Sequence, residues 1–160
     1  IRSDGRRLAV GCFLGDGQDP AAPWGVMIFD LEKPSVSLPT QFDGAWANLH
    51  PQYSRSIDAE RKHDLLLQHN HGVPRDARGE VIQPVDYRLI DVHVMRDDGT
   101  NLRDMPWGMD GIERCQGHQC WRGRTDWAIT STNTVIPGKG WIGGLLIESR
   151  SESTRLNSSH

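Results

Sequence analysis

Short apolar runs separated by turn residues recur along the whole chain. Residues 87–95 alternate most clearly between apolar and polar positions, and this period of two indicates a strand. No segment has the periodicity of a convincing amphipathic helix, and Pro84 interrupts the scattered apolar residues of 81–90. The pattern therefore predicts an all-β chain. Further strands are predicted at 8–14, 24–31, 36–38, 65–69, 102–106, 127–132 and 141–148.

The sequence of turn, apolar strand, loop and second strand occurs three times. Its corresponding positions Leu8, Leu65 and Trp127 are 57 and 62 positions apart. A β unit of about 60 residues is typical of propeller blades that carry inserted loops. We therefore predict that residues 1–149 form part of a β-propeller, with about two and a half antiparallel four-stranded blades. This number of blades cannot close a ring, so we expect a fragment.

Both ends of the chain look cut. The sequence begins without a methionine and already inside a turn-then-strand unit. Residues 150–160 lack apolar periodicity, and the stretch from Ser153 to His160 is similar to a translated sequencing adapter. We expect a non-native or disordered tail there, with an ordinary polar C-terminal tail as the alternative.

Composition narrows the class of protein. The 17 glycines, 9 prolines and 6 tryptophans among 160 residues favour a turn-rich β protein over a helical bundle. A formal net charge of −3 argues against a nucleic-acid partner, and no apolar run approaches the ~20 residues of a membrane span. Three cysteines make no disulfide framework, and no signal peptide opens the chain. We expect a cytoplasmic protein, with a periplasmic location as the alternative.

Histidines gather in two regions, and this concentration is the main indication of function. The first region contains residues 50–53 and 65–72, and the second is the polar segment 116–122. Five of the seven histidines lie in or beside them: His50, His63, His69, His71 and His118. Histidines at i and i+2 on a strand point to the same face, and propeller loops converge on one mouth. We therefore expect His50, His69 and His118 to face a common mouth.

Less specific interpretations of these residues stay open. Each histidine taken alone is more simply a hydrogen-bonded surface residue, and we expect His63 to be exposed and His93 to be structural. Cys115 and Cys120 enclose His118, but no second pair of cysteine or histidine ligands follows, so a closed zinc site is not supported. Nothing pairs a thiol with a base, so a catalytic cysteine is not supported either.

Four short motifs, in order, carry a resemblance to a known family. They are His-Pro-Gln-Tyr at 50–53, Leu-Gln-His at 67–69, the strand 87–95 with Asp-Gly-Thr-Asn at 98–101, and Gly-His-Gln-x-Trp at 117–121. Together they resemble the oligogalacturonate lyases, which are seven-bladed propeller enzymes of pectin degradation. The resemblance spans roughly residues 50–132.

The resemblance implies roles for two histidines. It implies His118 as a ligand of a divalent ion, most simply Mn²⁺, and His69 as the base that removes the proton. The chain departs from the family pattern at Asn70 and His71, where an acid and a glycine are expected. The family's remaining metal ligands, a glutamine and a His-x-His, belong to a later blade, so we expect an incomplete site in this fragment.

The chemistry of β-elimination fits these residue types. A base removes the proton alpha to the uronate carboxylate, positive charge stabilises the resulting anion, and a donor assists the leaving oxygen. We therefore predict a polysaccharide lyase acting on oligogalacturonide or another uronate oligosaccharide. Its predicted catalytic residues are His69, His50 and His71. Its predicted substrate-binding residues are Gln52, Asn70, Gln119, Trp121 and Arg122.

Two other functions remain as alternatives at this point. One is a non-catalytic β-propeller that serves as a binding or interaction module, and the other is the propeller cap of a serine peptidase. Both account for the blades, but neither accounts for the histidines. A His-x-His in a downstream blade would favour the lyase, and an α/β-hydrolase domain would favour the peptidase.

Overall fold

The computed structural model describes residues 1–43, 46–70, 75–83, 90–105, 114–115, 117–136 and 140–150, of which 114–115, 132–136 and 140–150 are described by their backbone alone. Within these ranges the chain is all-β, with antiparallel sheets and one 3₁₀ turn, Arg61–His63, labelled η1. The prediction of an all-β antiparallel chain is confirmed. Among the described residues no helix is long and apolar enough to cross a membrane.

The first sheet contains three strands in the order β1 (Arg7–Phe13), β2 (Trp24–Asp30) and β3 (Ser35–Phe42). The described residues thus give this sheet one strand fewer than the four predicted for each blade. The tight turn between β2 and β3 forms because the Asp30 carboxylate accepts the backbone N–H groups of Glu32 and Lys33, at 3.0 and 2.8 Å.

The second sheet has four strands in the order β4 (Ala47–Tyr53), β5 (Asp64–Asn70), β6 (Ile90–Arg96) and β7 (Arg103–Asp104). The predicted strands at 65–69 and 102–106 correspond to β5 and β7. The sequence pattern missed β4, because its outward positions are polar and Pro51 lies inside it. As the first strand of this order, β4 is an edge strand and tolerates proline better than a central strand does.

The third sheet is built around β10 (Trp127–Ile136), which pairs with β11 (Gly140–Arg150). Two short strands pair with β10 as well, β8 (Arg114–Cys115) and β9 (Cys120–Trp121). The predicted strands at 127–132 and 141–148 correspond to β10 and β11. Residues 117–119 of the polar segment therefore lie between the two short strands, and Cys120 and Trp121 form β9 itself, paired with β10.

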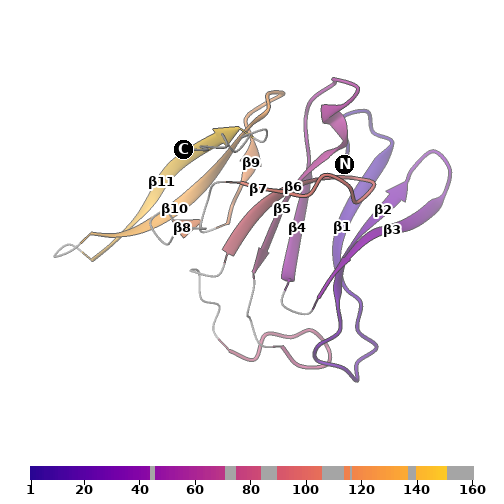
Figure 1. The fold of residues 1–160 in the computed structure, drawn as a ribbon, viewed down its shortest axis with the longest axis horizontal. Coiled ribbons are helices and arrows are strands. Elements are labelled where there is room, and N and C mark those ends of the chain that lie inside the picture. The colour runs from indigo at the N-terminus through magenta and orange to yellow at the C-terminus, as the bar shows by residue number, and fades with distance from the viewer. Residues whose placement is uncertain are drawn as a thin grey trace, which may run out of the picture.

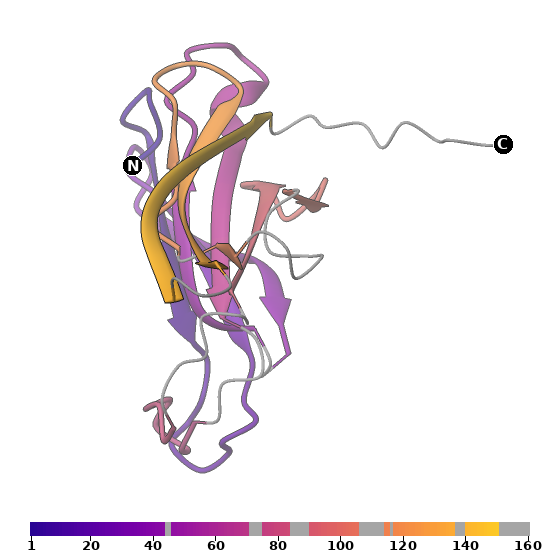
Figure 2. The same cartoon turned by 90° about the vertical axis from the view of Figure 1, so that its left-hand side faces the viewer.

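The three sheets follow one another in space as they do in the sequence, with the second sheet in the middle (Figures 1 and 2). Alternate residues of β5 and β6 point to opposite faces of the second sheet, so one set packs towards the first sheet and the other towards the third. Leu65, Leu67 and Met95 pack in one cluster with Val26 and Ile28 of β2. The intervening positions form a second cluster towards the third sheet: Leu66, Ile90, Val92 and Val94 with Met105, Trp121 and Ala128.

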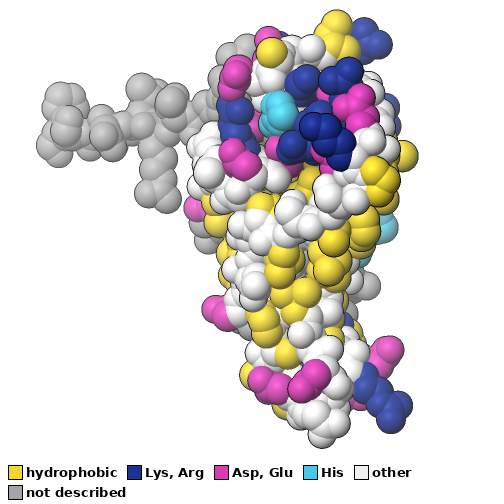
Figure 3. Space-filling view, turned by 90° about the vertical axis from the view of Figure 1, so that its right-hand side faces the viewer, with side chains coloured by type: hydrophobic (Ala, Val, Ile, Leu, Met, Phe, Trp, Pro, Cys, Tyr) yellow, Lys and Arg dark blue, Asp and Glu magenta, His cyan; other side chains and the backbone are white. Residues whose placement is uncertain are grey.

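Gly11 allows β1 to approach β4 closely. A methyl group at this position would overlap the backbone carbonyl of Leu49. The first and second sheets therefore pack at a separation that only glycine permits here. The space-filling view of this side of the molecule shows a band of apolar side chains (Figure 3). Val10 of β1 and Val36 of β3 are exposed apolar residues of the first sheet.

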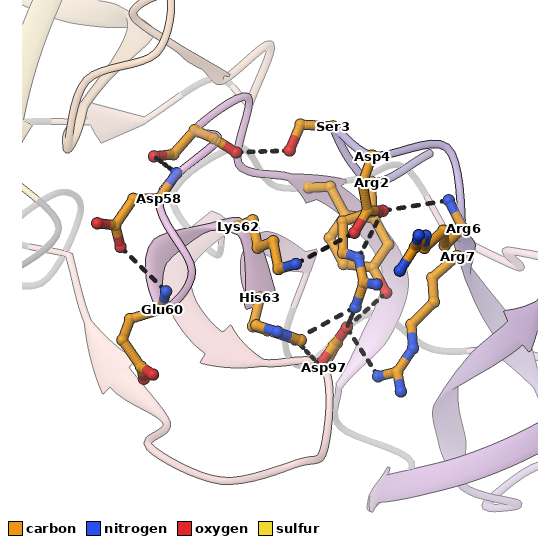
Figure 4. Close-up of polar contacts among 12 residues, drawn as sticks. Arg2, Ser3, Asp4, Arg6, Arg7, Asp58, Glu60, Lys62, His63 and Asp97 are labelled. Atoms are coloured by element: carbon orange, nitrogen blue, oxygen red, sulfur yellow. Dashed lines mark hydrogen bonds and ion pairs between the residues drawn. The ribbon is translucent and has the colours of Figure 1, made fainter.

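A buried carboxylate joins the start of the chain to the second sheet (Figure 4). Asp97, directly after β6, accepts hydrogen bonds from Arg2 at 3.3 Å, Arg7 at 3.1 Å and the Tyr53 hydroxyl at 3.1 Å. His63 Nδ1 lies 2.9 Å from the second carboxylate oxygen. Burying a charge is costly unless it is paired, and these four partners supply the pairing.

The same cluster shifts two neighbouring pKa values. The hydrogen bond from Arg2 holds the pKa of Asp4 well below its usual range, and Lys62 binds the other carboxylate oxygen at 3.3 Å. Burial raises the pKa of the Tyr53 phenol, and the negative charge of Asp97 raises it further. Both shifts favour a charged Asp4 and a neutral Tyr53.

We predict that Gly11→Ala destabilises the chain by about 1–3 kcal/mol or more, because the new methyl group meets a backbone carbonyl that cannot turn aside. Gly25→Ala in β2 is the matched control, since its nearest new neighbour is Leu38 Cδ1, the end of a flexible side chain. That change should cost less than about 1 kcal/mol. Urea unfolding followed by circular dichroism measures both, and equal costs would contradict the prediction.

We also predict that Asp97→Asn lowers the free energy of unfolding by about 3–5 kcal/mol, because it removes the buried negative charge that pairs with both Arg2 and Arg7. The neighbouring Asp98→Asn is the control. Asp98 is exposed and bonds only within its turn, to the backbone N–H and hydroxyl of Thr100. Chemical denaturation of the two variants at neutral pH tests the difference, and a small loss for Asp97→Asn would refute the role given to the cluster.

Candidate functional site

The segment from Gly117 to Trp121 lies against the free edge of β4. Trp121 Nε1 donates to the Gln52 carbonyl at 3.0 Å, and Gln52 Nε2 donates to the Gln119 carbonyl at 2.8 Å. Gln119 Nε2 also donates to the His50 carbonyl, at the longer distance of 3.4 Å. These hydrogen bonds fix the segment of the third sheet on β4, on the side of the second sheet where Trp121 packs with Leu66. We call His50, Gln52, His118, Gln119 and Trp121 the edge group.

Backbone geometry turns His118 outward. Gly117 and His118 both have left-handed backbones, with φ of 82° and 55°, and glycine adopts this conformation without strain. Gly117 packs on the Gln68 side chain, and its carbonyl accepts the Thr130 hydroxyl at 2.8 Å. His118 is therefore exposed on a turn that is fixed on both sides.

Within the edge group, some side chains are exposed to solvent and others are buried. His50, Gln52 and His118 are exposed, whereas Gln119 and Trp121 are buried. The Gln119 Oε1 atom is buried and has no hydrogen-bond partner among the residues that the structure describes. The exposed imidazoles can accept or donate a proton or bind a cation, and the amide oxygen is a further potential ligand.

Two further predicted substrate-binding residues, Asn70 and Arg122, lie outside the edge group. Asn70, at the end of β5, is buried and accepts a hydrogen bond from Gln68 Nε2 at 3.2 Å. The Arg122 side chain is exposed, and its backbone N–H donates to the Trp127 carbonyl at 2.8 Å. His71, predicted as a catalytic residue, lies outside the described residues.

His69 lies on the opposite face of the second sheet from Gln68 and the edge group. It is only 3% exposed, and its ring stacks on Trp46 with centroids 3.9 Å apart. Trp46 in turn stacks on Phe42 of β3 at 4.2 Å. The structure thus brings His69 to the first sheet, while His118 follows a glycine that packs on the other face of β5.

Two residues of β6 join His69. The register pairs His69 with Asp91, and His93 shares their face because it lies two residues further along the strand. The rings of His69 and His93 stack with centroids 4.9 Å apart. We call His69, Asp91 and His93 the buried histidine group. Its potential ligand atoms all lie within 4.8 Å of one another, and the group could hold a metal ion.

The sequence did not point to Asp91 or His93 as site residues, and His93 was expected to be structural. The available signal was their spacing of two on the most clearly alternating strand, which places both on one face. Their meeting with His69 also requires the register between β5 and β6, which spacing alone does not give. His63 is 28% exposed and contacts Asp97, so it is more enclosed than the expected surface histidine.

Two cysteines lie near these groups without joining them. Cys12 on β1 donates to the Gly25 carbonyl at 3.5 Å, and burial raises the pKa of its thiol. Cys120, beside Gln119, is exposed. Neither thiol has a described base beside it, so the structure adds nothing in favour of a cysteine nucleophile.

The chain matches no protein-family model, no curated protein and no solved structure at a significant level of similarity. A function for this chain is therefore inferred from the edge group, the buried histidine group and the motif resemblance.

We predict that Trp121→Phe lowers the free energy of unfolding by about 1 kcal/mol or more, because it keeps an aromatic ring but removes the donor to the Gln52 carbonyl. Urea unfolding of the variant gives the loss. If stability is unchanged, the indole hydrogen bond does not contribute to the docking of the third sheet on β4.

Proposed function

We propose that this chain is part of a β-propeller lyase that cleaves uronate oligosaccharides, such as oligogalacturonate, by metal-assisted β-elimination. The observation that carries the proposal is the edge group. Hydrogen bonds between two sheets join His50, Gln52, Gln119 and Trp121, and His118 precedes Gln119 in the chain. All five residues lie within the motifs that resemble the oligogalacturonate lyases. Two of the exposed side chains there are imidazoles, the type of group that such a reaction needs.

The arrangement of the sheets supports the propeller part of the proposal. Successive antiparallel sheets pack face to face in chain order, as consecutive blades do. A segment of the third unit also contacts the unit before it, since Gln119 and Trp121 bond to Gln52 of β4. A fold of blades of about this length is the simplest architecture with both properties.

Within the proposal, His50 is the residue best placed to take the proton. It is exposed on β4, and imidazole is the side chain that most often serves as a general base. His69, the base implied by the family resemblance, is buried in the aromatic stack and lies on the other face of the sheet. A base must reach the substrate, which favours His50.

The edge group also offers donors that suit a divalent ion. The His118 imidazole and the unpartnered Gln119 amide oxygen are nitrogen and oxygen ligands of the kind that manganese accepts. When bound, such an ion supplies positive charge that stabilises the anion formed from the uronate. Arg122, exposed just after the motif, is placed to bind a carboxylate through its guanidinium.

A non-catalytic binding module is the second candidate, and one observation favours it. Gln52 and Trp121, expected to bind sugar, use their amide and indole N–H groups in hydrogen bonds between the sheets. The Gln119 amide does the same. Such side chains have a structural role whether or not a substrate binds. The two candidates differ in whether a bond in the sugar is broken.

The test is the ultraviolet absorbance of the unsaturated uronate product, formed from short galacturonate oligomers by the complete propeller that we propose contains this chain. We expect His50→Ala to lower kcat by the ~10²–10⁴-fold typical of a lost base. His118→Ala should weaken the response to Mn²⁺, and excess Mn²⁺ should restore part of the activity. Gln41→Ala, an exposed glutamine on β3 of the first sheet, is the control and should change nothing.

Several outcomes separate the parts of this proposal. Absence of the unsaturated product with every divalent ion tested rejects the lyase and favours the binding module. Loss of turnover in His69→Ala, together with full activity in His50→Ala, returns the role of base to His69. Binding of galacturonate oligomers without turnover, measured by calorimetry, supports the second candidate.

A further inference from the structure

The buried histidine group has the donor set of a metal site that is separate from the edge group. It offers two imidazoles and one carboxylate from two adjacent strands, His69 on β5 and Asp91 and His93 on β6. Three protein ligands of this kind leave one position of a tetrahedral ion for water or another ligand. All three lie on the face of the second sheet that packs against the first sheet.

A fourth residue orients one of these ligands. Asp104 on β7 is paired with His93 in the β6–β7 register, and its carboxylate lies 2.9 Å from His93 Nδ1. This contact leaves Nε2 as the nitrogen that can bind an ion. A carboxylate behind a histidine ligand is a common feature of metal sites, where it fixes the orientation of the ring and makes its free nitrogen more basic.

We propose that His69, Asp91 and His93 bind a zinc-type ion, Zn²⁺ or Co²⁺, with Asp104 as the residue that positions His93. Imidazole-rich sites bind Zn²⁺ and Co²⁺ more tightly than Mn²⁺, because affinity rises along the first-row metals. The ion class thus differs from the manganese expected for the edge group. The ion ties β5 to β6 beneath the first sheet, so it adds stability whether or not the lyase proposal holds.

The aromatic stack around the group gives a signal for binding. Tetrahedral coordination at bonds of about 2.0–2.1 Å places ligand atoms roughly 3.3 Å apart, which is closer than the present spread of up to 4.8 Å. Binding therefore draws the ligand atoms closer together, and a shift of the His69 ring changes its stacking on Trp46, whose ring centroid lies 3.9 Å away. The fluorescence of Trp46 should change when the ion binds.

The experiment uses the full chain carrying His50→Gln and His118→Gln, so that the exposed imidazoles do not contribute. After treatment with a chelator, Zn²⁺, Co²⁺ and Mn²⁺ are added separately. Binding is followed by calorimetry, by tryptophan fluorescence and, for Co²⁺, by its visible absorption. We expect Zn²⁺ to bind at least about tenfold more tightly than Mn²⁺. In a Trp46→Phe variant, the fluorescence change should largely disappear.

Three substitutions test the ligands and the positioning residue. Asp104→Asn should weaken Zn²⁺ binding by ~10–100-fold, the usual effect of losing a carboxylate behind a histidine ligand. Asp91→Asn and His93→Gln should weaken it further. Asp98→Asn, an exposed aspartate just after β6, is the matched control and should bind as the parent does. Far-ultraviolet circular dichroism checks folding, and Asp104 is 43% exposed, so this variant is the one expected to keep the native fold.

Opposite results overturn the proposal in distinguishable ways. Unchanged Zn²⁺ binding in both Asp91→Asn and His93→Gln would show that this group does not hold the ion. Tighter binding of Mn²⁺ than of Zn²⁺ would overturn the ion class. Unchanged binding in Asp104→Asn would remove the positioning role from Asp104. These outcomes are read separately from the lyase proposal, because its deciding variants, His50→Ala and His118→Ala, belong to the edge group.

Discussion

The buried carboxylate of Asp97 is the interaction on which the relation between the first two sheets depends. Its partners come from the start of the chain, from β1, from the end of β4 and from η1, so one charge gathers four separate segments. A carboxylate in this position is stable only while its partners stay in place. The glycine contact between β1 and β4 then sets the distance at which the sheets meet.

This packing determines the surroundings of both histidine groups. Because the first sheet is held close to the second, Trp46 stacks on the His69 ring and Phe42 of β3 stacks on Trp46. The opposite face of β5 receives Gly117, whose missing side chain leaves room for Gln68. On one face of β5, His69 lies in a buried aromatic stack. On the other face, Gln68 lies beside the segment that carries the exposed His118. The two groups are chemically different because their surroundings are different.

The sequence predicted the strands that have a clear apolar pattern and missed those that do not. The predicted strands at 24–31 and 65–69 match β2 and β5 closely, since their buried faces are continuous or regular. β4 carries polar residues towards the junction and was not predicted. Short strands such as β9 contain too few residues to show any period. Local patterns identify a strand only when most of its neighbours are apolar.

The same limit applies to the candidate sites. The density of polar side chains at 116–122 indicated a special segment, and that segment does contact the strand that contains His50. The meeting of His69 with Asp91 could not be predicted, because a loop of about twenty residues separates β5 from β6 and fixes no register. Sequence spacing places residues on a face, but pairing between strands decides which faces meet.

The alternation along β5 has a consequence for how such a protein can change during evolution. Gln68 and His69 are adjacent in the sequence but belong to different chemical environments. Inserting or deleting a single residue in this strand would move every later side chain to the opposite face. It would bring an imidazole to the junction and an amide into the aromatic stack in one step. Length changes are therefore excluded from β5, and variation there is confined to substitutions that respect its two faces.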